Sequence, residues 1–191
     1  MTKLFVPGAG LLFMKVGVHA QETLEDIIRR KSEEIEKEGF AMWGYGGNTC
    51  HPRSMVQPFA HDFEERGQPI HLVMEEMDSK HDAEPLRANQ YSPDGTTWKD
   101  IPKNINVLGS RYALVINSLD TIEETISLDQ TRVPVGPSTG RLGSRYIKGR
   151  VDKACLEVLT KAELVNDEPG RTIDVQLAAK LREPYAVFLK I

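Results

Sequence analysis

Two stretches of the chain combine glycine, hydroxyl, aromatic and basic residues, a mixture that suits the binding of a planar anion. The first stretch covers residues 43–54 and offers Trp43, Tyr45, Gly46, Gly47, Cys50, His51 and Arg53. Glycine lets backbone N–H groups approach a phosphate or carboxylate closely. Aromatic rings stack on bases, and an arginine can pair with an anion through two hydrogen bonds. We therefore predict that this stretch binds a ligand.

The second stretch covers residues 136–150 and supplies hydroxyl groups and cations. Its candidate ligand-binding residues are Ser138, Thr139, Arg141, Ser144, Arg145, Tyr146, Lys148 and Arg150. If Tyr146 begins a strand, Tyr146, Lys148 and Arg150 share one face, because side chains alternate along a strand. The two stretches are complementary, so a shared pocket would make them one site. Separate placement would make both of them turns.

Neither stretch matches a motif that fixes a reaction. The first has no dinucleotide fingerprint, and the second lacks the Lys-Ser/Thr pair that ends a P-loop. The alternative for the first stretch is a tight turn at Gly46-Gly47-Asn48 with Trp43 in the core. The alternative for the second is a solvated loop followed by the outer face of a strand.

Cys50 and His51 are the candidates for nucleophilic chemistry. A thiol beside an imidazolium at a helix N-terminus would have a lowered pKa. Neighbours in sequence often point apart, however, and a small packed side chain is the simpler interpretation of Cys50. No His-x-x-x-His or Glu-x-x-His pattern falls on an expected helix. We expect no metal and no cofactor, and we leave open whether the protein is an enzyme.

The composition is that of an ordinary globular protein. The 191 residues carry a net charge of −4, which disfavours a protein that coats nucleic acid. No apolar run approaches the roughly 20 residues that span a bilayer, so we expect no membrane partner. Two cysteines make no disulfide framework and fit a reducing cytoplasm. We expect one domain, and we include a homodimer because symmetric dimers are common.

The expected elements follow from apolar periodicity and capping signals. Strands are expected at residues 11–19, 40–43, 70–74, 111–116, 122–128 and 185–191. Helices are expected from Thr23 to Gly39, from Ser54 to Gly67, and from Asp174 over Val175, Ala178 and Leu181. Residues 146–159 are expected to form a strand that becomes helical near Lys153, and residues 78–104 an ordered excursion with a hairpin or turn.

These elements predict an α+β fold. Because strands outnumber helices and do not alternate with them regularly, we expect a mixed or antiparallel sheet, with barrel-like curling as one form, and two or three packed helices. The leading hypothesis is a protein that senses or sequesters a nucleotide-like or other phosphate-bearing ligand without turnover. One alternative is a nucleotide-directed hydrolase or transferase that uses Cys50, His51 and Arg53. The other is a module that binds RNA or a modified base.

Overall fold

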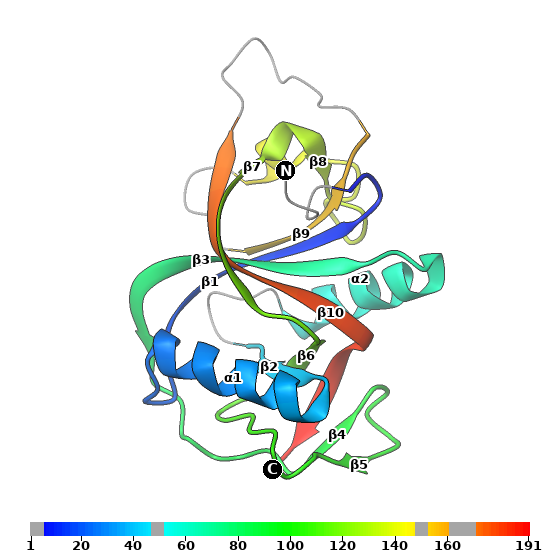
Figure 1. Cartoon of the computed structure of the whole chain (residues 1–191). Coiled ribbons are helices and arrows are strands. Elements are labelled where there is room, and N and C mark those ends of the chain that lie inside the picture. Colours follow the sequence, from blue (N-terminus) through cyan, green and yellow to red (C-terminus); the bar gives the residue numbers. More distant parts are fainter. Residues whose placement is uncertain (1–5, 47–51, 148–152, 161–170) are drawn as a thin grey trace.

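The computed structural model describes residues 6–46, 52–147, 153–160 and 171–191. The described chain forms one mixed sheet of ten strands with three α-helices (Figure 1), so the predicted α+β class is confirmed. In these residues the sheet runs from an edge at β2 to an edge at β8 and is not closed into a barrel.

The described chain contains ten strands, three α-helices and one 3₁₀ turn. They are β1 (Gly10–His19), α1 (Leu24–Glu38), β2 (Ala41–Gly44), α2 (Arg53–Arg66), β3 (Ile70–His81), β4 (Gln90–Ser92), β5 (Lys99–Asp100), β6 (Tyr112–Ile116), β7 (Asp120–Ser127), the 3₁₀ turn η1 (Leu128–Gln130), β8 (Thr131–Arg132), α3 (Gly143–Tyr146), β9 (Lys153–Val158) and β10 (Thr172–Lys190).

The main path of the sheet has the order β2-β6-β10-β3-β1-β9-β8. β1 and β3 are parallel, and the other named pairs are antiparallel. The 19-residue β10 pairs with β3, β4, β6 and β7, so it runs through most of the molecule (Figure 1). The sheet thus consists of an upper part around β7–β9 and a lower part around β2 and β6.

Both faces of the central part of the sheet carry buried side chains. Along β1 the side chains alternate: Leu12 and Met14 belong to a core shared with α1 and α2, whereas Leu11 and Phe13 face a second core with β7 and β9. The segment of residues 88–107 covers the far face of the lower part through a third core. It contains the β4–β5 hairpin, as expected for the excursion.

Helix α1 forms as the sequence predicts. The Thr23 hydroxyl accepts a hydrogen bond from the Asp26 backbone N–H at 3.2 Å, and Gly39 ends the helix with φ +81°. Its buried residues, however, are Ile27, Lys31 and Glu34. The inner face of this amphipathic helix thus carries two buried charged residues, and one of them, Lys31, lines a cavity described below.

Helix α2 packs closely on β1 because Gly10 has no side chain. A Cβ at Gly10 would lie 2.9 Å from both Ile70 Cγ1 and Phe59 Cζ. The apolar stripe of Val56, Phe59 and Phe63 is buried, and Gly67 ends the helix with φ +65°, as expected. The predicted N-cap Ser54 is wrong by two residues: Pro52 occupies the cap position, and the helix begins at Arg53.

Two predictions for the C-terminal third are wrong. Residues 174–181 lie in β10 rather than in a helix, and Lys153–Val158 is strand without a helical turn. Tyr146 does not begin a strand, because it ends the single turn of α3.

In the described ranges of the chain, no helix is long and apolar enough to cross a bilayer.

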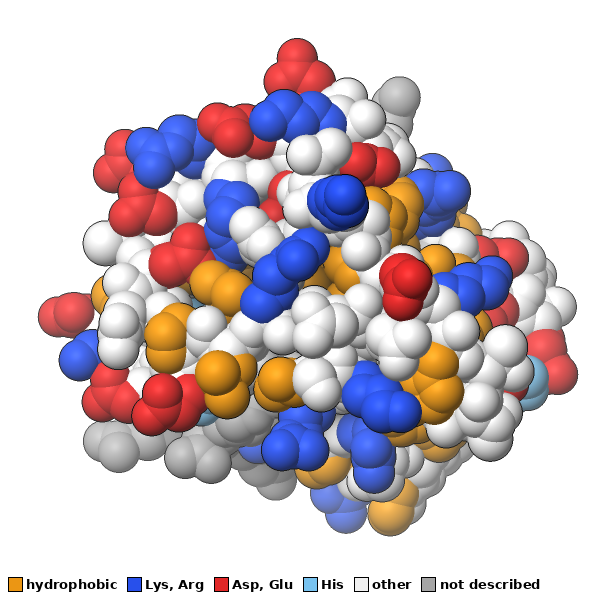
Figure 2. Space-filling model, turned by 90° about the horizontal axis from the view of Figure 1, so that it is seen from below, with side chains coloured by type: hydrophobic (Ala, Val, Ile, Leu, Met, Phe, Trp, Pro, Cys, Tyr) orange, Lys and Arg blue, Asp and Glu red, His pale blue; other side chains and the backbone are white. Residues whose placement is uncertain are grey.

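Figure 2 shows the molecule from below. Lys and Arg side chains gather across the middle of this face, with hydrophobic side chains exposed between them. Two cation–π contacts involve exposed basic side chains of β10: the Arg182 guanidinium lies 4.8 Å from the centre of the Phe40 ring, and the Lys190 ammonium 5.1 Å from that of Trp98. These cation–π contacts hold long side chains flat against the surface.

Candidate functional site

Two adjoining cavities lie where β1 and β3 end. The deeper one has a volume of about 260 Å³ and the more open one about 450 Å³. They share His19, Gly46 and His81 in their walls. These three residues come from β1, the segment after β2, and β3, so the junction of the cavities is also the junction of three elements.

The deep cavity has apolar walls and basic side chains. Its apolar residues come from four elements and the 104–110 segment; they are Met14, Val16, Val18, Leu24, Ile27, Trp43, Met77, Val107 and Leu108. Its basic residues are Lys15, Arg30, Lys31 and Lys80, together with the two histidines. Such a surface can bury a flat apolar group and attract a negative charge at the same time.

The open cavity is more polar. Tyr45 and Tyr112 form part of its wall in an edge-to-face pair, with ring centres 6.4 Å apart. Arg53 and Arg111 bring two guanidinium groups to it. Arg53 also lies over the Phe188 ring, 5.0 Å from its centre, and burial raises the pKa of the Tyr112 phenol well above its usual value.

The charge in both walls has one sign. Among the described residues, no Asp or Glu lines either cavity, whereas six Lys and Arg residues do. The chain as a whole has a net charge of −4, so the basic lining is a local property. Arg30, Lys31 and Lys80 also form ion pairs with carboxylates that lie outside the cavity walls. The attraction for an anion is therefore strongest at Arg53 and Arg111 in the open cavity, where low dielectric leaves the field poorly screened.

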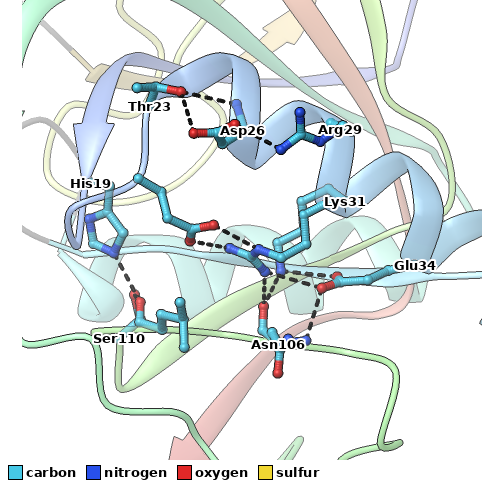
Figure 3. Close-up of polar contacts among 11 residues, drawn as sticks. His19, Thr23, Asp26, Arg29, Lys31, Glu34, Asn106 and Ser110 are labelled. Carbon is cyan, nitrogen blue, oxygen red and sulfur yellow. Dashed lines mark hydrogen bonds and ion pairs between the residues drawn. The ribbon is translucent and has the colours of Figure 1, made fainter.

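A buried ionic network holds α1 over the deep cavity. Arg30 donates to both Glu22 carboxylate oxygens, at 2.6 and 3.0 Å, and to Glu34 at 3.1 Å. Lys31 donates to Glu34 at 3.1 Å and to the Asn106 carbonyl at 2.5 Å, and Arg30 donates to the same carbonyl. Figure 3 shows Lys31 and Glu34 reaching from α1 toward Asn106. Two acids and two bases balance within the network.

Lys31 is the most deeply buried of the cavity's basic residues. Its exposed fraction is 3%, and burial lowers the pKa of its ammonium to about 8, against the opposing attraction of Glu34. The Asn106 backbone N–H donates back to Glu34 at 2.9 Å. The network therefore fixes the 104–108 segment, whose Val107 and Leu108 line the deep cavity.

His19 and His81 are direct neighbours on the parallel strands β1 and β3. Their Nδ1 atoms lie 2.9 Å apart, with ring centres 4.9 Å apart and planes within 6° of parallel. The pairing depends on a register shift: up to Val16 the partner lies 60 positions later, but from Val18 onward it lies 62 later. Without this irregularity in β3, Ser79 would stand opposite His19.

A carbonyl group fixes the orientation of His19. His19 Nε2 lies 3.0 Å from the Leu108 carbonyl oxygen, which can only accept, so Nε2 carries the proton. Burial is the main factor that lowers the pKa of His19 below its usual value; the Leu108 contact opposes this effect, and His81 adds to it. His19 is thus held neutral, with its Nδ1 lone pair directed at His81.

The backbone around the pair adopts unusual conformations. Ala20 and Gln21 both have positive φ, +47° and +68°, in a tight hairpin closed by hydrogen bonds between His19 and Glu22. Gly109 has φ +63°, and a Cβ there would lie 2.8 Å from the Ala83 Cβ. Left-handed non-glycine residues carry strain and gather at functional sites, in agreement with a site at this position.

The predicted residues of the first stretch fall at the cavities wherever the structure describes them. Trp43 lines the deep cavity, Tyr45 and Arg53 line the open one, and Gly46 lines both. Trp43 and Tyr45 are also core residues, 5% and 2% exposed. A structural role in the core, the alternative to ligand binding, is therefore compatible with their position in the cavity walls. Gly47, Cys50 and His51 lie outside the described residues, and the cysteine mechanism stays a prediction.

The second stretch lies elsewhere over the length that the structure describes. Residues 133–142 close on themselves through backbone hydrogen bonds, among them Gly140 to Val133 and Val133 to Arg141, both 2.8 Å. The described candidates line neither cavity; they are Ser138, Thr139, Arg141, Ser144, Arg145 and Tyr146. Lys148 and Arg150 lie outside the described residues. The second stretch approaches α2, since a Cβ at Gly136 would lie 2.7 Å from Met55 Cε.

Sequence reasoning missed the residues that make most of the site. Lys15, His19, Arg30, Lys31, Lys80, His81 and Arg111 are far apart in the chain. One signal was present, since His19 ends a strand that the sequence predicted correctly. Its partner His81 lies seven residues beyond the end of the strand predicted at residues 70–74. Only the parallel pairing of β1 with β3 brings the two together.

No protein-family model, curated protein or solved structure matches this chain. A functional assignment therefore depends on the geometry of the cavities. Within the described ranges, no three His, Cys, Asp or Glu side chains are grouped so that they could hold a metal ion.

Proposed function

We propose that the protein binds a small anionic ligand of nucleotide-like build, with a flat apolar part and a phosphate or similar group, and senses or sequesters it. The observation that carries the proposal is the lining of the two joined cavities: apolar and aromatic walls with basic side chains and, among described residues, no acid. Volumes of about 260 and 450 Å³ suit such a ligand, since small-molecule sites measure about 300–1,000 Å³.

The two cavities suit different parts of the ligand. In the deep cavity, Trp43, Ile27 and Val107 offer apolar surface for a ring. In the open cavity, Arg53 and Arg111 offer charge-assisted hydrogen bonds to an anionic group. Pro52 and Arg53 are also the start of α2, whose first turn carries no acidic residue. The positive end of a 14-residue helix adds to the attraction of the two arginines.

The test measures ligand binding and its dependence on these arginines. Protein purified without a step that strips nucleotides is examined by native mass spectrometry, and stripped protein by thermal shift with a panel of nucleoside mono-, di- and triphosphates. We expect a bound anion or a stabilising nucleotide. Arg53→Gln and Arg111→Gln each weaken binding about ten- to a hundredfold, as for a lost charged hydrogen bond of about 1.5–3 kcal/mol.

Arg29→Gln is the matched control. Arg29 is an exposed arginine of α1 whose ion pair with Asp26, at 2.9 Å, lies outside both cavities, so this variant keeps full affinity. Arg141→Gln tests the second stretch, which the proposal leaves out of the site. No bound anion together with no shift from any nucleotide would refute the proposal.

Two further expectations belong to the proposal. The buried Cys155 thiol is free, as expected in the reducing cytoplasm where we place the protein. We propose a homodimer as its assembly. Fluorescence microscopy of the tagged protein and sedimentation equilibrium check the two expectations separately.

A further inference from the structure

We propose that the anionic group of the ligand binds at His81 Nε2, and that binding is coupled to the uptake of one proton by the His19–His81 pair. This inference rests on the proposed function and goes deeper, because it names the atom that holds the anion. The class of ligand is an oxyanion, such as a phosphate or sulfate ester, whose apolar remainder occupies the deep cavity.

The hydrogen bonds of the pair determine where its protons lie. The Leu108 carbonyl accepts from His19 Nε2 at 3.0 Å, so the neutral His19 ring has its lone pair on Nδ1. The 2.9 Å contact between the Nδ1 atoms then requires His81 Nδ1 to donate. A neutral His81 that donates from Nδ1 keeps its lone pair on Nε2, and a further proton adds there without breaking either hydrogen bond.

The position of the pair suits an anion that spans the two cavities. His19 and His81 line both of them, and the shared Gly46 lies beside them without a side chain to fill the junction. His19 is half-buried and oriented from both ring nitrogens, whereas His81 is exposed. His19 therefore acts as a positioning residue, and His81 presents the atom that can meet a ligand.

The charged groups around the pair decide which proton state an anion favours. From the hairpin after β1 and from α1, Glu22 and Arg30 face His19, but they neutralise each other through two hydrogen bonds. At the end of β3, Lys80 pairs with Asp82 at 2.9 Å. On α1, Lys31 pairs with Glu34 at 3.1 Å. Arg53 and Arg111 add positive charge from the open cavity, and among the described residues no Asp or Glu lines either cavity.

The positive charge of Arg53 and Arg111 opposes a positive charge on the histidine pair while the cavities hold no anion. A bound oxyanion removes the opposition and accepts a hydrogen bond from His81 Nε2–H. The proton comes from solvent, His81 becomes an imidazolium, and no covalent bond changes. Because one proton is taken up with each anion, affinity rises as pH falls between the pair's pKa in the complex and its pKa in the free protein, by up to tenfold per pH unit.

The first experiment observes the ring nitrogens directly. Long-range ¹H–¹⁵N NMR spectra of the ¹⁵N-labelled protein report the tautomer of each histidine between about pH 5 and pH 8, the range in which imidazoles titrate. We expect a proton on His19 Nε2 and on His81 Nδ1. Sodium sulfate, which keeps its charge over this range, increases the fraction of protein with a proton on His81 Nε2 relative to sodium chloride of equal ionic strength and pH.

The second experiment measures binding. Calorimetric titration with AMP in buffers of different ionisation enthalpy gives the number of protons taken up, expected to approach one near neutral pH after correction for the phosphate's own titration. His81→Asn keeps a donor at the place of Nδ1 but has no Nε2, so proton uptake is lost. The matched control is His61→Asn, since His61 is an exposed histidine of α2 whose partner is Glu65; it retains the uptake.

The outcomes separate the two proposals. If AMP binds but no proton is taken up, or if His81→Asn takes up the proton as the wild type does, the inference is wrong and the proposed function stands. A proton on Nδ1 of His19 also overturns it. If neither AMP nor sulfate perturbs any cavity residue at millimolar concentration, the proposed function fails, and the inference fails with it.

Discussion

Lys31 Nζ lies 3.1 Å from Glu34 Oε2, and the two residues are 3% and 2% exposed. One turn of α1 thus carries an ion pair that is almost completely removed from water. Glu34 also accepts from Arg30 and from the Asn106 backbone. The pair is the connection between α1 and the segment that supports His19, so its integrity bears on both stability and binding.

Removal of the Glu34 charge is expected to be costly. Glu34→Gln leaves the Lys31 and Arg30 charges with Glu22 as the remaining acid of the network. Loss of one partner of a buried ion pair typically costs about 3–5 kcal/mol. Urea denaturation should show this loss for Glu34→Gln, whereas the control Arg29→Gln, at an exposed pair on the same helix, stays within about 0.5 kcal/mol. Equal stability of the two variants would contradict the prediction.

The Lys31 ammonium is expected to titrate near neutral pH. Burial lowers its pKa from 10.5 to about 8. Between these two values the unfolded chain holds the proton and the folded chain does not, so the stability contributed by this group rises with pH from about 8 to 10.5. Relative to Lys31→Met, the wild type should gain about 3 kcal/mol over this range.

Two measurements check this prediction. The ¹³Cε resonance of Lys31 gives its pKa in the folded state, and urea denaturation of the wild type and Lys31→Met gives the pH dependence. Lys37, the basic residue in the last turn of the same helix, serves as the reference resonance. A Lys31 resonance that moves together with that of Lys37 would contradict the prediction.

Much of the fold was predictable because local signals agreed with the tertiary structure. Thr23, Asp26 and Gly39 delimit α1 through backbone hydrogen bonds and a left-handed cap, which depend on neighbouring residues alone. The same holds for Gly67 at the end of α2. Local chemistry of this kind does not need the rest of the chain.

The wrong secondary-structure predictions fall where the apolar residues fit both the spacing of a helix and the spacing of a strand. Val175, Ala178 and Leu181 fit a helical spacing, but Ile173, Val175, Leu177 and Ala179 also fit the spacing of a strand. Pairing with β3 and β7 decides for the strand. The register shifts between Val175 and Leu177, so that Val175 and Ala178 belong to one core and Leu177 and Ala179 to the other. In β9, the adjacent residues Ala154 and Cys155 are both buried because a different core covers each face of the sheet.

The site was only partly predictable because its residues meet through long-range pairing. Trp43, Tyr45, Gly46 and Arg53 were found because they cluster in sequence. The His19–His81 pair depends on a parallel strand pair and on a register shift within β3, neither of which leaves a local signal. Arg141 and Arg145 show the converse, since they cluster in sequence but line neither cavity; their predicted role in ligand binding stays a prediction.

The stability of the protein is expected to fall on mild acidification because of His19. Burial lowers the pKa of His19 in the folded state below the unfolded value of 6.5. As pH falls below about 7, the His19 imidazole binds a proton in the unfolded chain but stays neutral in the folded chain. The contribution of His19 to the free energy of unfolding is therefore present above pH 6.5 and is lost as pH falls toward its lower pKa in the folded state.

The variant His19→Gln tests this pH dependence. Gln keeps a donor for the Leu108 carbonyl but does not titrate. Its free energy of unfolding should therefore decline less than that of the wild type between about pH 7 and pH 5. His61→Gln, at an exposed pair on α2, should follow the wild type. Parallel profiles for the wild type and His19→Gln would count against a neutral, buried His19.

Gly109 is expected to tolerate no side chain. Its φ of +63° disfavours other residues, and a Cβ would lie 2.8 Å from the Ala83 Cβ and 3.0 Å from the Glu84 carbonyl oxygen. Gly67 has nearly the same φ, +65°, with no atom within 4 Å of its Cβ position. Gly67→Ala should therefore cost the backbone strain alone, about 1 kcal/mol, whereas Gly109→Ala should cost about 2–3 kcal/mol because rigid backbone must also move. Thermal unfolding of the two variants measures the difference. Since Gly109 and the neighbouring Ser110 line the open cavity, Gly109→Ala should also weaken the proposed nucleotide binding. An equal loss of unfolding free energy in the two variants would instead show that the cavity wall can move to accept a methyl group.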